Sequence, residues 1–277
     1  MKKVPNIVHK VLTEYNSLLK KHFPNTLEGV YLHGSIALNA FIEGSSDIDF
    51  ITVMNRNLTK IDIQRISEIH NIIALKYQHS KLDGVYILWE DMGRLESKND
   101  SYPYYNESKL SVGTYSSLNP VTWWILKSKG IKIVGPEICT IKLNTSTDQL
   151  ISYVIKNMNF YWAPRIERIE NSIEDVITLP TKEINIEIEW LVLGLLRQFY
   201  TLKEQDIISK HGAGEYALQH FSGEFLNIIN EAINIRTGQK HKFFHSEEKR
   251  IKTAIDLSKY IIKYCNHNFN QARVGER

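Results

Sequence analysis

The stretch Leu27–Met54 reads LEGVYLHGSIALNAFIEGSSDIDFITVM, and it decides how the first half of the chain folds. Its two ends are rich in β-branched and aromatic residues, which predicts strands over residues 27–33 and 47–54. Gly34-Ser35 ends the first strand, and we expect a short helix over residues 36–41. The pattern therefore predicts a strand, a tight turn with a short helix, and a second strand.

Two acidic residues, Asp47 and Asp49, open the second strand, and eleven residues separate Gly34-Ser35 from Asp47. Residues two apart in a strand project from the same face, so the two carboxylates are expected side by side, with Ile48 and Phe50 on the other face. Like charges this close need a cation between them, and Mg²⁺ is the usual one. Gly34-Ser35 stands where a strand meets a helix, a place where backbone N–H groups bind phosphate. A cation beside a phosphate-binding turn is typical of nucleotide chemistry.

A third acid, Asp83, precedes a strand predicted over residues 85–89. If that strand lies beside the strand of residues 47–54, the three carboxylates meet at one edge of the sheet. The alternative for Asp83 is a turn residue, because Asp-Gly pairs are common in turns.

The remainder of the first half predicts further elements around this motif. Apolar residues from Val4 onward have helical spacing and predict a helix that ends near Phe23-Pro24. The same spacing returns over residues 59–79. Residues 96–120 are polar and rich in turn formers, which we interpret as a long loop or lid. A helix over 121–128 and a strand over 131–134 complete this half.

From residue 147 onward the apolar spacing is helical almost throughout. The predicted helical segments are residues 147–172, 184–202, 205–221, 223–236 and 246–266. We therefore predict an α+β fold, with an N-terminal domain of residues 1–145 in which helices surround a mixed sheet, followed by a C-terminal α-helical bundle of residues 146–277.

Composition excludes several classes of protein. The 277 residues carry a formal net charge of +3 and are 43% hydrophobic, which favours a globular chain without a nucleic-acid or membrane partner. The two cysteines, Cys139 and Cys265, are far apart and form no CxxC, so neither a disulfide framework nor a cysteine zinc site is expected. The longest apolar run, Leu191–Leu196, is far below the ~20 residues of a membrane span. The N-terminus lacks a signal-peptide core, and a cytoplasmic location is expected.

The motif formed by Gly34-Ser35 and Asp47-Ile48-Asp49 resembles the signature of the polymerase-beta-like nucleotidyltransferase superfamily. Val30–Leu38 followed by Ser46–Asp49 is similar to the streptomycin/spectinomycin adenylyltransferases, the aminoglycoside 3''- and 9-type enzymes. The second half resembles the helical C-terminal domain of that group through Trp190–Leu202, Ser209-Lys210 and Gly212–Leu218. The resemblance covers most of the chain and is patchy between residues 95 and 120.

The resemblance implies roles for the motif residues. Gly34 and Ser35 would hold the β- and γ-phosphates of ATP, and Asp47 and Asp49 would ligate Mg²⁺. The third acid of the family, a glutamate that binds metal or acts as general base, falls on Asp83. Aspartate is one methylene shorter than glutamate, which favours metal ligation over direct proton abstraction by Asp83, although both roles stay open.

Three residues of the second half match functional positions of the group. Arg197 and Lys210 match basic residues that reach the nucleotide phosphates, and Glu187 matches an acid that binds the aminoglycoside. The alternatives are a surface arginine, a solvated lysine and an acid that complements the helix dipole, respectively. The family's lid aromatic has no clear counterpart in residues 109–115.

We therefore hypothesise a Mg²⁺-dependent O-nucleotidyltransferase that transfers AMP from ATP to a hydroxyl of an aminoglycoside or aminocyclitol antibiotic, of the spectinomycin or streptomycin type, and releases pyrophosphate. The expected partners are ATP and a cationic small molecule, and the expected state is a monomer or weak dimer. The alternatives are nucleotidyl transfer to a protein or another small hydroxyl acceptor, and a non-catalytic nucleotide-binding regulator.

Overall fold

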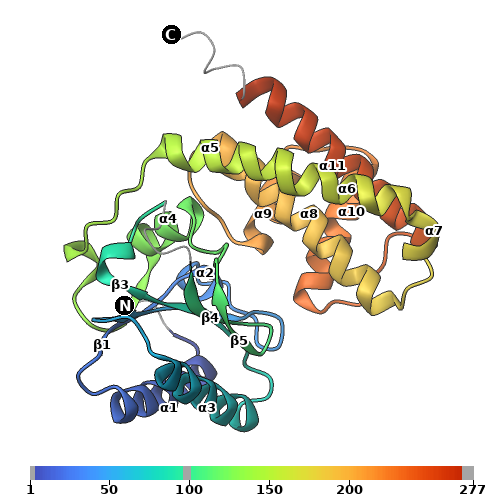
Figure 1. The fold of residues 1–277 in the computed structure, drawn as a ribbon. Coiled ribbons are helices and arrows are strands. Elements are labelled where there is room, and N and C mark those ends of the chain that lie inside the picture. The colour runs from blue at the N-terminus through green and yellow to red at the C-terminus, as the bar shows by residue number, and fades with distance from the viewer. Residues whose placement is uncertain (1–3, 96–100, 270–277) are drawn as a thin grey trace. The chain divides into compact units, whose positions relative to one another are not determined.

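The computed structural model describes residues 4–95 and 101–269, and the chain divides into two compact units, residues 1–146 and 147–277 (Figure 1). The first unit contains a mixed sheet with helices, and the second unit is helical. The predicted fold class is thereby confirmed. Every helix within the described ranges is too short or too polar to cross a lipid bilayer.

The sheet of the first unit has six strands in the order β5-β4-β3-β2-β1-β6. β2 and β3 run parallel, and every other neighbouring pair is antiparallel. The strands are β1 (Leu27–Leu32), β2 (Ile48–Met54), β3 (Leu82–Leu88), β4 (Tyr102–Asn106), β5 (Lys109–Gly113) and β6 (Ile131–Val134). The sequence predictions for β1, β2, β3 and β6 are confirmed to within three residues.

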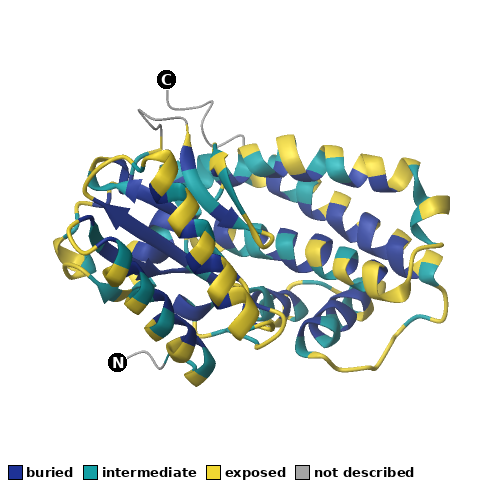
Figure 2. Ribbon diagram, turned by 60° about the horizontal axis from the view of Figure 1, so that its bottom comes forward, coloured by how far each residue is buried: buried dark blue, intermediate teal, exposed yellow. Residues whose placement is uncertain are grey.

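Helices cover both faces of this sheet. On one face α1 (Asn6–His22) and α3 (Lys60–Lys76) pack on a core that includes Phe50 and Tyr86. On the other face α4 (Pro120–Lys129) packs through Trp123 against Ile51 and its neighbours. The central strands are accordingly the most deeply buried part of the unit (Figure 2). Burial of both faces fixes the strand register, because a slip of one residue would exchange the faces of every side chain.

Two sequence predictions for this unit are wrong in detail. The predicted loop over residues 96–120 contains the hairpin β4–β5, whereas residues 96–100 of that prediction lie outside the described residues. The hairpin turns at Glu107-Ser108, where both residues have positive φ without a glycine, so the usual Asn-Gly signal is absent. The short helix expected over residues 36–41 is α2 (Gly34–Ala37), and the left-handed Asn39 prevents its continuation.

The second unit is built around α8 (Thr181–Glu204), which packs against α9 (Lys210–Leu218), α10 (Glu224–Thr237) and α11 (Glu247–Phe269). Before it come α5 (Thr147–Asn157), a π-helical turn (Met158–Trp162), α6 (Ala163–Asn171) and α7 (Ile173–Val176). The single helix predicted for residues 205–221 is shorter than expected, because Gln205 is left-handed and Ser209 caps α9.

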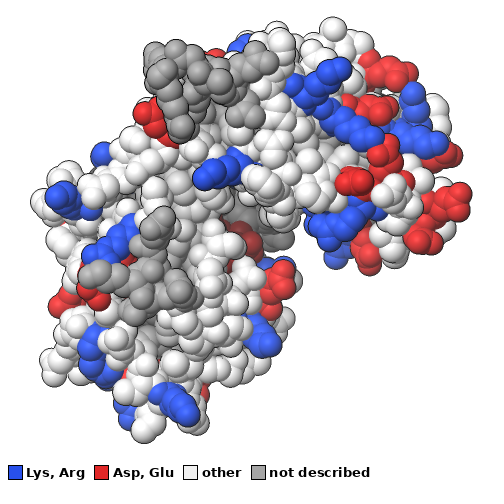
Figure 3. All heavy atoms as spheres, turned by 45° about the horizontal axis from the view of Figure 1, so that its top comes forward, with Lys and Arg blue, Asp and Glu red and all other residues white. Residues whose placement is uncertain are grey.

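The surface of this unit intersperses the two signs of charge, as the face shown in Figure 3 illustrates. Exposed ion pairs join Lys249 to Glu224, Lys252 to Glu248 and Lys259 to Glu170. Pairs of this kind contribute little to stability, about 0–1 kcal/mol each.

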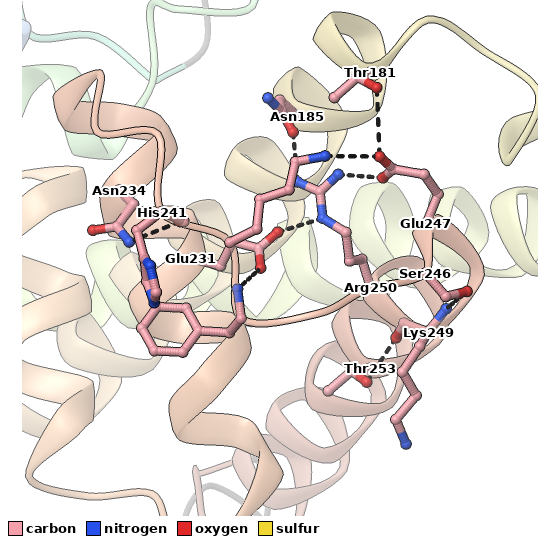
Figure 4. Close-up of polar contacts among 12 residues, drawn as sticks. Thr181, Asn185, Glu231, Asn234, His241, Ser246, Glu247, Lys249, Arg250 and Thr253 are labelled. Atoms are coloured by element: carbon pink, nitrogen blue, oxygen red, sulfur yellow. Dashed lines mark hydrogen bonds and ion pairs between the residues drawn. The ribbon is translucent and has the colours of Figure 1, made fainter.

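One charge cluster of the helical unit is buried instead (Figure 4). The guanidinium of Arg250 on α11 donates hydrogen bonds to Glu231 on α10, to Asn185 on α8 and to Glu247 one turn earlier on α11. Arg250 and Glu231 are each only 1% exposed. The second carboxylate oxygen of Glu231 accepts from the backbone N–H of Phe243 at 2.9 Å. This cluster therefore ties three helices and the loop before α11 together.

Candidate active site

Strand register brings two of the predicted acids together at the edge where β2 and β3 begin. The parallel pairing of β2 and β3 aligns Asp49 directly with Asp83. The alternation expected along β2 is present, because Ile48 and Phe50 are fully buried and Asp49 is half-buried. Asp47 precedes the strand by one residue and is exposed. Hence Asp49 and Asp83 form the centre of the candidate site.

Gly34 lies against the carboxylate of Asp49. Its φ is +58°, and a methyl group built on its Cα would stand 1.9 Å from Asp49 Oδ2 and 2.4 Å from Asp49 Cγ. The backbone N–H of His33 donates to the carbonyl of Asp49 at 3.2 Å, which holds the turn on the start of β2. Two independent reasons therefore require glycine at this position, the left-handed backbone and the close carboxylate.

Two buried polar atoms of the same turn, Ser35 Oγ and His33 Nε2, have no hydrogen-bond partner within the described part of the chain. Burial lowers the pKa of His33 to about 4, so its ring is neutral. Buried polar atoms are nearly always paired in native proteins. The hydroxyl of Ser35, beside Gly34 and Asp49, is thus available to donate to an anionic ligand.

Asp83 is held by two side chains of the β4–β5 region. Tyr115 Oη donates to Asp83 Oδ1 at 2.6 Å, and Asn106 Nδ2 donates to Asp83 Oδ2 at 2.8 Å. Burial raises the pKa of the Asp83 carboxyl, the two hydrogen bonds oppose this rise, and the charge of Glu107 adds to it. Burial and the negative charge of Asp83 raise the pKa of Tyr115, so that hydroxyl remains a donor.

The oxygen atoms at this edge of the sheet suit a hard cation whose coordination shell is completed by a substrate. Among the described residues, no three His, Cys, Asp or Glu side chains come close enough to hold a metal ion by themselves. Mg²⁺ commonly uses one or two protein carboxylates and fills its other positions with water and substrate phosphate. The neighbouring carboxylates of Asp49 and Asp83, with the unpartnered hydroxyl of Ser35 beside them, fit that kind of site.

The helical unit contains a cationic cluster around Glu189. Lys210 Nζ donates to Glu189 Oε1 at 3.0 Å, and Arg236 Nη1 donates to the same oxygen at 3.2 Å. Lys210 Nζ also lies 4.9 Å from the ring centroid of Trp190. Burial lowers the pKa of Lys210, Glu189 opposes this shift, and the charges of Arg236 and Arg197 add to it. Glu189, which is 15% exposed, thus pairs with two cations, and the charge of Arg197 also acts on Lys210.

The predicted phosphate ligands Arg197 and Lys210 belong to this one cluster, and Arg197 Nε donates to the carbonyl of Ile208 at 3.1 Å. Arg236, which is 8% exposed, also belongs to this cluster and was not predicted from the sequence. It lies in the last turn of α10, where a basic residue normally complements the helix dipole, so its position alone gives no functional signal.

Glu187 is not part of this cluster. Its two carboxylate oxygens accept from Arg165 on α6, at 3.0 Å from Nε and 2.6 Å from Nη2. Two residues along a helix point in widely different directions, which separates Glu187 from Glu189. The predicted substrate acid therefore carries a bidentate arginine partner that the sequence did not reveal.

Comparison with known proteins first defines the class. Residues 12–94 match the family model of the nucleotidyltransferase domain, the segment that contains Gly34, Asp49 and Asp83. Residues 160–260 match the model of the aminoglycoside adenylyltransferase C-terminal domain. The chain is an enzyme of the nucleotidyltransferase superfamily. Within it, the chain resembles the aminoglycoside adenylyltransferases, because the model of their C-terminal domain matches most of its helical unit.

A solved structure shares this fold. A crystal structure of spectinomycin adenyltransferase AAD(9) from Enterococcus faecialis with ATP and spectinomycin superposes with a TM-score of 0.67 at 18% identity, over 92% of this chain and 99% of that chain. A mutant of the toxin–antitoxin pair MntA–HpeT matches with a TM-score of 0.26 at 16% identity, over 60% of this chain and 98% of that chain. No curated protein sequence matches the chain.

Proposed function

We propose that the enzyme transfers AMP from ATP to a hydroxyl group of an aminoglycoside or aminocyclitol antibiotic, of the spectinomycin or streptomycin type, and releases pyrophosphate. The observation that carries this proposal is the alignment of Asp49 with Asp83 beside the Gly34-Ser35 turn. The match of residues 160–260 to the aminoglycoside adenylyltransferase C-terminal domain supports the acceptor class, and the likeness to a structure that contains ATP and spectinomycin supports both substrates.

We assign Mg²⁺ binding to Asp47 and Asp49, with Asp83 as a further candidate ligand. When bound, the metal would neutralise the triphosphate and favour in-line attack at the α-phosphorus. Gly34 permits close approach of the phosphates to the backbone, and the Ser35 hydroxyl is placed to donate to a phosphate oxygen.

Asp83 serves in this proposal as the general base. The acceptor oxygen forms a bond to the α-phosphorus, the bond from that phosphorus to the bridging oxygen breaks, and the hydroxyl proton passes to the Asp83 carboxylate. The burial that raises the pKa of Asp83 makes it a better proton acceptor. Each of its oxygens accepts one protein hydrogen bond and retains a lone pair for the substrate.

Lys210 and Arg197, joined by Arg236, bind the departing pyrophosphate in this proposal. Lys210 and Arg236 donate to the same oxygen of Glu189, and Arg197 acts electrostatically on Lys210, so three basic side chains are gathered that suit an anionic ligand. Glu187 is assigned to the cationic antibiotic, as the family resemblance implies. Because a carboxylate has about four lone-pair sites, Glu187 can accept from an aminosugar while Arg165 occupies two of them.

A pyrophosphate-release assay with ATP and Mg²⁺ tests this function. We expect release that depends on spectinomycin or streptomycin, with kanamycin and a reaction without antibiotic as the comparison arms. Removal of Mg²⁺ by a chelator should abolish release, because nothing would offset the charge of the triphosphate. Asp47→Asn is the variant that tests metal binding. Because Asp47 is exposed and precedes the strand, the substitution should leave the fold intact.

The outcomes of the assay separate the candidate functions. Binding of ATP without release in any arm would favour a nucleotide-binding regulator and would refute the proposal. Release that depends on an added protein instead of an antibiotic would favour a protein acceptor. Full activity of Asp47→Asn would refute the metal assignment of that residue.

A further inference from the structure

Asp83 receives a hydrogen bond on each carboxylate oxygen, and both donors come from the hairpin region that follows β3. The pairing of β3 with β4 aligns Gly84 with Tyr105, which brings Asn106, the next residue of β4, alongside Asp83. The Asn106 amide spans the remaining distance at 2.8 Å. Asp49, Asp83 and Asn106 thus stand in one row across β2, β3 and β4.

Tyr115 approaches the same carboxylate from the segment after β5. Its side chain is 8% exposed, and its ring packs on that of Tyr104 with centroids 5.2 Å apart. Its hydroxyl lies 2.6 Å from Asp83 Oδ1 and within the electrostatic influence of Asp49. The aromatic ring packs in the hydrophobic core, whereas the hydroxyl points toward Asp83.

Two donors on two different oxygens fix the plane of a carboxylate as well as its position. An aspartate has two side-chain torsions, and without such partners its carboxyl group rotates broadly. Catalysis by a general base needs the accepting oxygen within hydrogen-bond reach of the proton, and a displacement of 1 Å can cost ~10²-fold in rate. Because an aspartate is short, it cannot recover a lost alignment by extending.

We propose that Tyr115 and Asn106 are positioning residues that orient the Asp83 carboxylate toward the acceptor hydroxyl. This inference rests on the proposed function, in which Asp83 takes the proton. It assigns the hairpin β4–β5 a direct part in the active site: the hairpin carries Asn106 and leads to Tyr115.

The test uses the full-length enzyme with Mg²⁺, ATP and the antibiotic that drives pyrophosphate release. Tyr115→Phe and Asn106→Ala should each lower kcat by about 10- to 100-fold, with KM values for both substrates and the thermal midpoint nearly unchanged. Tyr104→Phe is the matched control, because it removes a hydroxyl from the ring partner of Tyr115 on the same hairpin. This control should retain the activity of the parent enzyme.

A double-mutant cycle separates positioning from other roles. In an Asp83→Asn background, Tyr115→Phe should cause no further loss, because residues that act through one group are non-additive. Equal losses in both backgrounds, or a loss of kcat matched by lower ATP affinity and a lower thermal midpoint, would overturn the inference. An Asp83→Asn enzyme of full activity would instead refute the proposed base. If Asp83→Asn were impaired while Tyr115→Phe kept full activity, the positioning role of Tyr115 would be refuted and the proposed base would stand.

Discussion

Gly34→Ala is expected to lower turnover by at least ~100-fold while the sheet of the first unit stays folded. The added methyl group would stand 1.9 Å from Asp49 Oδ2, far inside van der Waals contact. The carboxylate is the movable partner in this contact, since Gly34 is held by the backbone bond from His33 to Asp49. The substitution therefore displaces the proposed metal ligand. The measurement is kcat in the pyrophosphate-release assay, with circular dichroism to check the fold.

Gly44→Ala is the matched control for this experiment. Gly44 also has a positive φ, +79°, but no atom of the described residues lies within 4 Å of its added methyl group. Both substitutions introduce backbone strain of roughly 1–2 kcal/mol, and only Gly34→Ala displaces Asp49. Equal activity of the two variants would contradict the assignment of Asp49 to the active site.

Arg250→Leu is expected to lower the free energy of unfolding of the helical unit by about 3–5 kcal/mol, because it leaves the buried carboxylate of Glu231 without its counter-charge. Glu231 is 1% exposed, and among the described residues it would keep the backbone N–H of Phe243 as its hydrogen-bond donor (Figure 4). Hydrogen exchange of the α8, α10 and α11 amides at increasing urea concentrations reports this unit separately from the sheet.

Lys252→Ala provides the comparison on the same helix. Lys252 forms an ion pair with Glu248 one turn away, and both side chains are about half-exposed. Such a pair contributes about 0.3–0.5 kcal/mol, so the loss should be small. If Arg250→Leu cost no more than this control, the buried cluster would not be what holds the three helices together.

Much of the site could be predicted from the sequence because its signals are local. The alternation at Asp47–Phe50 and the glycine before Ser35 lie within one supersecondary unit, and the structure aligns Asp49 with Asp83 as the strand patterns suggested. Local patterns also identified β6 and the helical character of the second half, although not every helix boundary.

The missed features depend on contacts between distant segments. The hairpin β4–β5 is polar and turns without glycine, and its side chains become recognisable only through the register that places Asn106 beside Asp83. Arg236 approaches Lys210 through the packing of α10 on α8 and α9, which no local pattern encodes. The Arg165 partner of Glu187 was missed for the same reason.

The mass of the antibiotic after reaction tests the central claim most directly. Spectinomycin and streptomycin are each incubated with the enzyme, ATP and Mg²⁺, and the mixture is analysed by mass spectrometry. We expect at least one of the two to gain the mass of a single AMP moiety, with one pyrophosphate released per modified molecule. Unmodified antibiotics, with AMP attached to the enzyme or to another protein, would contradict it.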